Sequence, residues 1–580
     1  MSVKLAPGMG IDVSTSIADG ADFDVVIVGA GMSGLYSAWR IGESWRESPV
    51  LREWAAERPD GKLRVAILEW SDRVGGRIDT RIVADMENVP AEVGGMRFTK
   101  DHKIVSMMVD HFKLPTEPFP MTKDSQFCLR SYRFDETGIQ AGTPVPYALS
   151  PDEKKQTPNQ LFNYAIKKIC NYSNEWTDAN WQWIKQNYRY SDAVYDNVHL
   201  YDIGFWNILY RTLSNEGYDY VWDGGGYNSN TINWNAAEAM PYMTTDFSVT
   251  PSYLRIKTGY HQLAVSLAKA VRAQGTPIVG NTRLVRFDKQ GDRTIGRVRP
   301  TAGGSEATFK SRALMLALPQ KSLQLIDQDC EFFENKRVQY CIQSVLPQPS
   351  YKLFIAYDKR WWDKSAFYPG PTITDMPLRM TYDFGSEEER GGLPGDTRTL
   401  LLASYADMNA DSFWSVLERE TPYTQPPSDS RIAADGGANA PPTMQRMAES
   451  MLVQVFEMNN AQPKPAKIIG AYYQDWSQEP YGAGYHAWAA HYKVWEVMRE
   501  VRKPMPDRHV YIFGEAYSNA QGWVEGAFCT AESVLTDFLR LPLLKGLDPH
   551  YPLLTPEPVE PGNEESHPTY FMQRTSLNVF

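Results

Sequence analysis

The sequence predicts an α/β fold that combines a discontinuous Rossmann-like nucleotide-binding domain, a mixed-sheet substrate domain and an inserted helical domain. Three patterns predict the first domain: a strand, glycine-rich turn and helix near the N-terminus, a helix and strand near the middle, and a strand and helix near the C-terminus. Residues 150–240 are rich in Trp, Tyr and Asn and contain helical stretches such as "QLFNYAIKKICNY", which indicates the helical insertion.

The N-terminal pattern, "DVVIVGAGMSGLYSAWRIG", has the order of a dinucleotide-binding unit. Its β-branched run, Val25 to Val28, is followed by Gly29, Gly31 and Gly34. The first glycine permits a tight turn, the second lets the backbone approach a pyrophosphate, and the third lets the helix pack against the strand. The start of the helix, with Ser33, offers free N–H groups to the phosphates. The alternative is a glycine-rich turn that binds no ligand.

An acidic residue at the end of the next strand is the second part of such a site. Glu69 closes "RVAILE" and can accept hydrogen bonds from ribose hydroxyls. It lies 35 residues after Gly34, whereas the usual spacing is about 20. The charged stretch "ESWRESPVLREWAAERPDGK" explains the excess as a surface insertion. A solvated glutamate at a strand end is the alternative.

The next segment, "EWSDRVGGRIDT", contains Gly75, Gly76 and Arg77. From the first strand to Arg77, the chain resembles the FAD-containing amine oxidase family, in which an R-x-G-G-R segment follows the ribose-binding acid and contacts the cofactor's phosphates. The resemblance implies that the cofactor is FAD and that Gly76 and Arg77 bind it. The Rossmann-like domain is then an FAD-binding domain.

The C-terminal pattern, "HVYIFGEAYSNAQGWVEGAFCTAESVL", predicts a strand over Val510 to Phe513, a polar loop, and a helix that begins near Gly522 or Trp523. It looks like the closing motif of the same family. The resemblance implies that the strand-end acid, Glu515, lies beside the ribityl or pyrophosphate part of FAD and that the helix N-terminus points at the flavin ring. The residues assigned to FAD here are Gly514, Glu515, Gly522, Trp523 and Val524. For this segment alone, a core helix after a strand is the alternative.

The middle pattern runs from "YLRIKTGYHQLAVSLAKAV" to "PIVGNTRLVRFD" and predicts a helix and then a strand. It resembles the second FAD-binding block of the family, and Val285 matches the position that packs near the adenine.

Around Lys352 the chain is similar to the L-amino acid oxidase branch, with a lysine on a strand, aromatic residues, T-D-x-P-x-R and then Tyr382. The resemblance implies that Lys352 binds a water near flavin N5 and that the Tyr382 hydroxyl helps to hold the substrate carboxylate. A solvated strand lysine is the alternative for Lys352.

The segment "GGMRF" resembles the part of L-amino acid oxidases whose arginine pairs with the substrate carboxylate. Arg97 suits this role, because a guanidinium presents two parallel donors and keeps its charge. Gly94, Gly95 and Met96 are expected to contact the cofactor, with the glycines beneath the isoalloxazine. A surface arginine after a glycine turn is the alternative.

The implied reaction is FAD-dependent oxidation of L-amino acids by O2 to 2-oxo acids, ammonia and hydrogen peroxide. Lys352 and Trp523 are the residues expected at the reacting centre, while Arg97, Tyr382, Gly522 and Trp523 bind the substrate. The aromatic content of the helical insertion and of residues 321–465 favours large neutral or aromatic amino acids.

Monoamine oxidases attach the flavin through a cysteine near a segment that resembles "DWSQEPYGAGYHAW". That segment contains no cysteine here, and Tyr485 stands about where the cysteine would be. The departure predicts noncovalent FAD. Trp476 is the aromatic residue expected beside the ring, with core packing as its alternative role.

Three other functions stay open. An amino acid 2-monooxygenase shares the fold and the carboxylate-binding arginine but forms an amide. An amine or polyamine oxidase would have no use for Arg97. A noncatalytic binding protein could keep this fold without flavin, although the set of Gly29, Glu69, Arg77 and Glu515 disfavours it.

The patterns divide the chain into seven parts. We expect FAD-binding segments at 22–100, 251–320 and 466–545, substrate-domain segments at 101–149 and 321–465, a helical insertion at 150–250 and a C-terminal tail at 546–580.

Composition limits the partners. The 59 basic and 70 acidic residues give a net charge of -11 without a Lys/Arg block, which disfavours nucleic acid as a partner. The five scattered cysteines and nine histidines show no metal-ligand spacing, so no metal is predicted. The N-terminus lacks a secretory apolar run, and no run approaches the roughly 18 apolar residues of a transmembrane span. We therefore expect a cytoplasmic protein, and the family resemblance suggests a homodimer.

Overall fold

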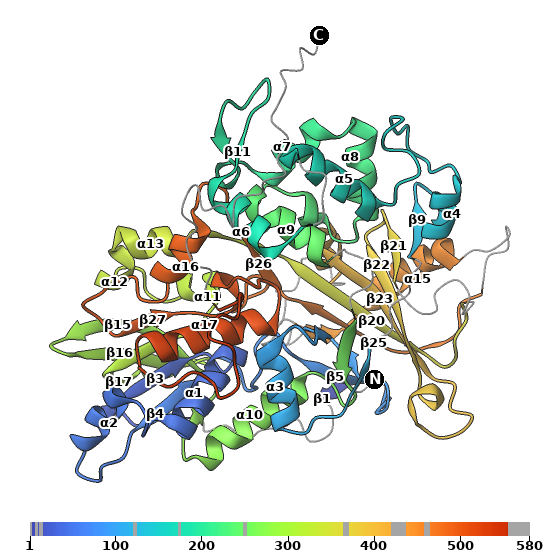
Figure 1. The fold of residues 1–580 in the computed structure, drawn as a ribbon. Helices are drawn as coiled ribbons and strands as arrows, with labels where there is room; N and C mark the ends of the chain where they lie inside the picture. Colours follow the sequence, from blue (N-terminus) through green and yellow to red (C-terminus); the bar gives the residue numbers. More distant parts are fainter. Residues whose placement is uncertain are drawn as a thin grey trace, which may run out of the picture.

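A five-stranded parallel sheet forms one half of the molecule. The computed structural model describes residues 3–5, 10, 16–119, 125–171, 176–246, 252–362, 371–418, 437–456 and 464–554. The strand order is β14-β4-β3-β18-β27, with bounds Ile278–Val279, Val65–Leu68, Val25–Val28, Ala313–Leu316 and Val510–Ile512. Strands β3, β4 and β27 are labelled in Figure 1. All neighbouring pairs are parallel. Strands from three distant parts of the chain therefore build one sheet, and the prediction of a discontinuous Rossmann-like α/β fold is confirmed.

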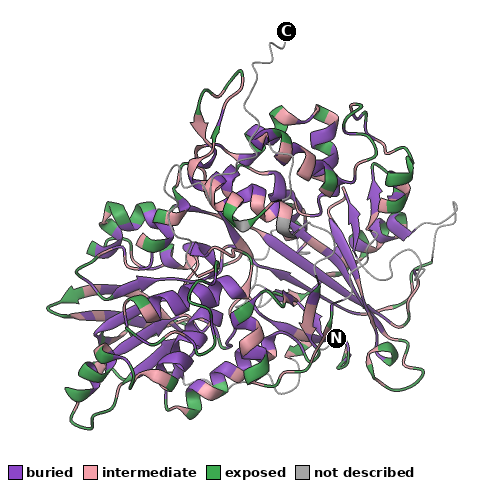
Figure 2. Cartoon of the chain, in the orientation of Figure 1, coloured by how far each residue is buried: buried purple, intermediate pink, exposed green. Residues whose placement is uncertain are grey.

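Three helices pack together beside this sheet. They are α1 (Met32–Ser44), α10 (His261–Ala273) and α17 (Val524–Asp537). Their apolar faces share one core with the strands, and the four residues of β3 are buried (Figure 2). Sheets covered in this way have strands that are apolar throughout, as in "VVIV".

An eight-stranded mixed sheet forms the second half, in the order β10-β9-β21-β22-β23-β20-β25-β24. The bounds in chain order are β9 Gln126–Leu129, β10 Tyr132–Asp135, β20 Ser350–Tyr357, β21 Thr372–Thr374, β22 Met380–Ser386, β23 Thr399–Asp407, β24 Gly437–Asn439 and β25 Ile468–Asp475. Side chains of β20 alternate between two cores. Leu353 and Ile355 pack on the side of α14 (Asn409–Leu417) and α15 (Pro442–Phe456), whereas Phe354 and Ala356 face the helical insertion. Lys352 has the parity of the second set.

The helical insertion lies at the top of Figure 1. Its helices are α5 Pro158–Cys170, α6 Asp178–Asn187, α7 Phe205–Thr212, α8 Asn215–Gly224 and α9 Ala236–Asp246. Helix α5 begins at a capping box, in which Thr157 and Gln160 each accept the other's backbone N–H, and ends at Asn171 in the left-handed conformation.

The structure also has two smaller sheet units. In the first, β15 (Thr282–Gln290), β16 (Arg293–Pro300) and β17 (Ala307–Ser311) pair antiparallel, and β2 (Ala21–Asp22) pairs with β17 in parallel. The other unit has the order β7-β13-β8, with bounds Phe98–Thr99, Tyr253–Ile256 and Thr116–Pro118. The remaining α-helices of the described residues are α2 Pro49–Ala56, α3 Lys103–His111, α4 Glu136–Ala141, α11 Gln320–Gln324, α12 Glu331–Glu334, α13 Lys336–Ile342 and α16 Val494–Glu500.

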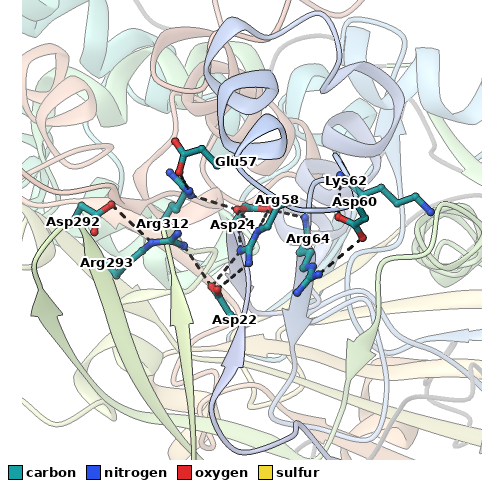
Figure 3. A network of polar contacts seen from close by, with 10 residues as sticks. All are labelled: Asp22, Asp24, Glu57, Arg58, Asp60, Lys62, Arg64, Asp292, Arg293 and Arg312. Atoms are coloured by element: carbon teal, nitrogen blue, oxygen red, sulfur yellow. Dashed lines mark hydrogen bonds and ion pairs between the residues drawn. The ribbon is translucent and has the colours of Figure 1, made fainter.

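Ion pairs join the amino ends of the parallel strands (Figure 3). Asp24, just before β3, lies 3.0 Å from Arg58 Nη2 and 3.4 Å from Arg312 Nε, which directly precedes β18. Arg58 also pairs with Asp22 at 2.8 Å. The network links the first and second segments at one end of the sheet and leaves the opposite, carboxyl end for the site.

Two segments near the expected divisions pack with the other half of the molecule. Residues such as Leu323 and Phe332, in the expected substrate segment 321–465, share a core with strands of the parallel sheet. Strand β25 lies within 466–545, expected to be FAD-binding, but it pairs with β20 in the eight-stranded sheet. Of the tail expected at 546–580, residues 555–580 lie outside the described part of the chain.

Candidate active site

A deep cavity opens at the carboxyl ends of β3 and β4 and extends to the eight-stranded sheet. The predicted residues that line it are Gly29, Gly31, Ser33, Glu69, Gly76, Arg77, Gly94, Gly95, Met96, Arg97, Lys352, Trp476, Gly514, Glu515, Gly522, Trp523 and Val524. They come from six separate regions of the sequence. In α/β folds, ligands bind beyond the carboxyl ends of the parallel strands, as this cavity allows.

The glycines of the first turn are required by close approach of backbone to backbone. Gly29 has φ +104°, and a Cβ atom there would lie 2.7 Å from the carbonyl oxygen of Ala317. A Cβ atom at Gly34 would lie 2.0 Å from the carbonyl oxygen of Gly29. Gly34 therefore serves the packing of α1 on β3 and does not line the cavity. No side chain caps the start of helix α1 at Gly31. The first backbone N–H groups of the helix can therefore donate to a ligand in the cavity.

Glu69 supports this turn. Its Oε2 accepts a hydrogen bond from the Ala30 N–H at 2.7 Å, and its Oε1 accepts from the backbone and hydroxyl of Ser71 at 2.9 and 2.8 Å. The carboxylate lies at the end of β4 on the cavity wall, where a ribose would be within reach.

The C-terminal motif is bound to the R-x-G-G-R segment. Arg77 Nη1 lies 2.8 Å from Glu515 Oε2, and the N–H groups of Gly522 and His486 donate to Glu515 Oε1 at 2.8 and 3.0 Å. Burial alone would raise the pKa of Glu515, but Arg77, His486 and the Gly522 N–H together lower it to about 2. Glu515 is therefore an anion in the folded protein.

The Gly94-Gly95 segment crosses the cavity above Lys352. The Lys352 Nζ donates to the carbonyl oxygens of Glu92 at 2.9 Å and Gly94 at 2.6 Å. Gly95 is exposed to the cavity, and a Cβ atom there would lie 2.6 Å from Ile78 Cδ1. The segment thus presents bare backbone, which suits contact with a flat ring.

Lys352 is buried on β20, with 2% of its surface exposed. Burial lowers its pKa to about 7, although the nearby Glu92 acts in the opposite direction. Burial likewise raises the pKa of Glu92 to about 7. The lysine can therefore exist as an amine or as an ammonium near neutral pH.

Arg97 lies among aromatic rings in the cavity. Its guanidinium carbon is 4.1 Å from the ring centroid of Tyr253 and 5.4 Å from that of Phe119. Burial lowers the pKa of Arg97, and four phenol groups more than offset this, so the pKa is raised. They belong to Tyr382, Tyr253, Tyr227 and Tyr405. Arg97 is a permanent cation.

Aromatic residues form the remaining walls. Trp476 donates its Nε1–H to the Val93 carbonyl at 2.8 Å and is buried. Trp523 precedes α17 as its N-cap residue and stacks with Tyr253, with ring centroids 6.0 Å apart and planes at 17°. Tyr485 packs beside Gly522, since a Cβ atom there would be 3.8 Å from the tyrosine ring.

The orientation of Tyr485 follows from its partners. Ser229 Oγ donates to Asp407 Oδ2 at 2.6 Å and also contacts the Tyr485 hydroxyl. Because the hydroxyl proton of Ser229 points at the carboxylate, Tyr485 donates its own proton to Ser229. Its ring therefore stands fixed in the cavity wall.

Besides Gly34, two other predicted site residues lie outside the cavity lining. Val285 does not line it, although Thr282, Arg283 and Leu284 on the same strand do. Tyr382 is buried behind the lining against Phe119, with ring centroids 6.2 Å apart. Its phenol still acts on Arg97 through space.

The sequence analysis missed several tyrosines that line the cavity: Tyr227, Tyr242, Tyr253, Tyr260, Tyr405 and Tyr481. Tyr405 shows why. It lies directly opposite Lys352 in the register of β23 and β20, and the Lys352 Nζ is 4.5 Å from its ring centroid. No local motif reveals the register between two strands about 50 residues apart.

The cavity fits FAD by its own features. It combines a glycine turn at a helix start, a strand-end carboxylate, an exposed glycine segment and aromatic walls. None of the described lining residues is a cysteine or a histidine. Among the residues that the structure describes, no group of three or more His, Cys, Asp or Glu could hold a metal ion. No described helix has the length and apolar character that crossing a membrane requires.

Comparison with known proteins gives a consistent picture. The family model for flavin-containing amine oxidoreductase matches residues 32–534. Aplysianin-A of Aplysia kurodai is 25% identical, covering 89% of this chain and 90% of its own length. Achacin of Lissachatina fulica is 24% identical, covering 89% and 93%. An L-amino-acid oxidase of Demansia vestigiata is 22% identical, covering 89% and 86%.

Solved structures show the same architecture. Wild-type putrescine oxidase bound to putrescine superposes with a TM-score of 0.61 at 16% identity, covering 90% of this chain and 100% of that one. At this identity the likeness concerns the fold.

Proposed function

Because the chain belongs to the flavin-containing amine oxidoreductase family, we propose that this FAD-dependent oxidase acts on L-amino acids and forms 2-oxo acids, ammonia and hydrogen peroxide. The observation that carries the proposal is Arg97, a permanent cation on the wall of the cavity beside the Gly94-Gly95 segment. A guanidinium in this place can bind a carboxylate with two parallel hydrogen bonds.

The side chains around Arg97 can orient such a substrate. With the carboxylate on Arg97, the Trp523 ring borders the site, and the backbone of Gly522 lies within the same wall. FAD held by the lining residues such as Glu69 and Arg77 would supply the chemistry, as the acceptor for a hydride from the substrate Cα with O2 as the final oxidant. The protein contributes position and charge.

Lys352 can hold a water in either protonation state. As a neutral amine, it uses both N–H groups on the carbonyls of Glu92 and Gly94 and keeps its lone pair to accept a proton. As an ammonium, it has a third N–H to donate. A pKa of about 7 makes both states accessible near neutrality.

Noncovalent FAD and large neutral or aromatic substrates are parts of the same proposal. The absence of cysteine and histidine from the described cavity lining supports the first, and the tyrosines around Arg97 support the second. A cytoplasmic location and a homodimer stay predictions of the sequence.

Product analysis with a panel of L-amino acids tests the proposal. We expect 2-oxo acid, ammonia and peroxide in equal amounts, whereas an amide would indicate the 2-monooxygenase. In Arg97→Met, which should keep FAD, we expect substrate binding to weaken by on the order of 3 kcal/mol, because the carboxylate loses its charged partner. Arg97→Lys should restore only part of it.

The decarboxylated amine of the best substrate is the internal control. Its kcat/KM should not fall in Arg97→Met, since it has no carboxylate to lose. If Arg97→Met keeps the wild-type kcat/KM for the amino acid, the proposal is wrong and an amine or polyamine oxidase becomes the better assignment.

A further inference from the structure

Tyr253 is placed beside Arg97 by the pairing of two strands. In the antiparallel pair of β13 and β7, Tyr253 lies opposite Thr99 and Leu254 opposite Phe98. Continuing this register puts Arg97 diagonally across from Tyr253, on the same face. Diagonal neighbours in a sheet lie close enough for long and aromatic side chains to touch.

The contact is a cation over an aromatic face. The Arg97 guanidinium carbon lies 4.1 Å from the Tyr253 ring centroid, closer than its 5.4 Å distance to Phe119. Both Tyr253 and Arg97 line the cavity, and only 5% of the tyrosine surface is exposed. Cation–π attraction strengthens when the pair is withdrawn from water in this way.

The same ring also touches Trp523. The two rings stack with centroids 6.0 Å apart and planes at 17°, and His102 packs edge-on against Trp523 at 4.8 Å. One tyrosine thus contacts both the arginine and the aromatic residue at the start of α17.

We propose that Tyr253 is a positioning residue that holds the Arg97 guanidinium at the angle required for paired binding of a carboxylate and sets Trp523 beside it. The proposal rests on the assignment of Arg97 as the carboxylate-binding residue. Arginine has a long side chain with many rotamers, and two parallel hydrogen bonds form only when its plane is fixed. The aromatic face of Tyr253 supplies that restraint, while its hydroxyl is not required.

The test compares side chains at position 253 with and without an aromatic ring in the FAD-loaded enzyme. The probes are benzoate and its uncharged analogue benzamide, whose binding is followed by titration of the flavin absorbance. Tyr253→Phe keeps the ring, whereas Tyr253→Met and Tyr253→Leu fill the space without one. We expect benzoate affinity within about twofold of wild type in Tyr253→Phe and a loss of at least tenfold in the two aliphatic variants.

Benzamide affinity should change little in any variant, which separates loss of the carboxylate site from general damage to the cavity. Tyr351→Leu is the matched control. Tyr351 is a buried tyrosine stacked on Tyr473 at 5.7 Å and packs on the face of β20 opposite to Lys352. It should lose stability without losing benzoate affinity.

The outcomes distinguish the two assignments. If Arg97→Met binds benzoate as wild type does, the carboxylate role of Arg97 is wrong. If Arg97→Met loses benzoate but Tyr253→Met keeps wild-type affinity, the positioning role of Tyr253 is overturned while the Arg97 site stands. If Tyr253→Phe loses as much benzoate affinity as the aliphatic variants do, the positioning role is also overturned, since the hydroxyl would then matter more than the ring. If one aliphatic variant fails to bind FAD, the other decides.

Discussion

Lys352 shows how a single residue acquires an unusual protonation state from its position in a strand. Its neighbours in "KLFIAY" are buried, and the side chain points to the cavity because it shares the parity of Phe354 and Ala356. Two backbone carbonyls hold its nitrogen. Burial then lowers the pKa to about 7, a range suited to proton transfer.

Replacing Lys352 by methionine should leave FAD bound but slow a flavin half-reaction. We expect slower flavin reduction or reoxidation at saturating substrate in rapid-mixing experiments, because the water held at Nζ would be lost. In wild type, the lone pair disappears as pH falls below about 7, so the affected rate should fall there. The variant should lack that limb of the profile.

Lys269→Met provides the comparison, since Lys269 is an exposed lysine on α10. It should behave as wild type. Unchanged rates for both half-reactions in Lys352→Met would assign the lysine to support of the Gly94-Gly95 segment alone.

At the residue scale, local motifs predicted cavity residues such as Gly29, in a glycine-rich turn, and Glu69, at the end of a strand. Arg97 and Lys352 followed from family resemblance, and the structure brings both to the cavity wall. Tyr253 and Tyr405 could not be predicted, because strand register places them there. Val285 and Tyr382 lie one layer away from the lining, a difference that depends on side-chain direction rather than on sequence pattern.

At the scale of elements, the loop before α17 is held by a carboxylate. Glu515 connects the end of β27 to the end of the polar loop through the Gly522 N–H, to β26 (Tyr485–Trp488) through His486, and to the R-x-G-G-R segment through Arg77. The sequence predicted both ends of the strand and the start of the helix here within two residues. It could not predict that Glu515 binds Arg77, because their partnership spans more than 400 residues.

Glu515→Gln should destabilise the protein in a pH-dependent way. Burial raises the pKa of Glu515, but Arg77, His486 and Gly522 overcome this and lower it to about 2. A carboxylate with a lowered pKa stabilises the fold above its unfolded pKa, by on the order of 3 kcal/mol here. That contribution disappears as pH falls from about 4.5 to 2.

Thermal unfolding of the FAD-free protein between pH 7 and pH 3 measures this effect. The Glu515→Gln variant should have the lower Tm at pH 7, and the gap should narrow toward pH 3. Asp101→Asn is the control, since the Asp101 side chain is 95% exposed, and its Tm should match wild type. A gap that stays constant with pH would show that the charge of Glu515 contributes nothing to stability.

At the scale of the whole molecule, the cavity joins parts that the sequence keeps apart. Strands from three segments form the parallel sheet, and the ion pairs around Asp24 hold its far end. The alternation of strand and helix predicted this half of the fold. The order of the eight-stranded sheet could not be predicted, because β9 and β10 precede the helical insertion in the sequence, whereas the other six strands follow it.

Removal of FAD should therefore loosen the molecule as a whole. The cofactor would bridge the first segment at Gly29 and Glu69, the second at Thr282 and the third at Glu515, all of which line one cavity. Acid precipitation should release all of the yellow colour, since no cysteine or histidine is among the described lining residues. The FAD-free protein should have a lower Tm, and added FAD should raise the Tm as its concentration rises. At an FAD concentration one hundred times Kd, the free energy of unfolding should increase by about 2.7 kcal/mol. FMN should not restore the Tm, because it lacks the adenosine part that we assign to the first two segments. Colour retained in the precipitate would contradict noncovalent binding, and full rescue by FMN would show that the flavin half alone joins the segments.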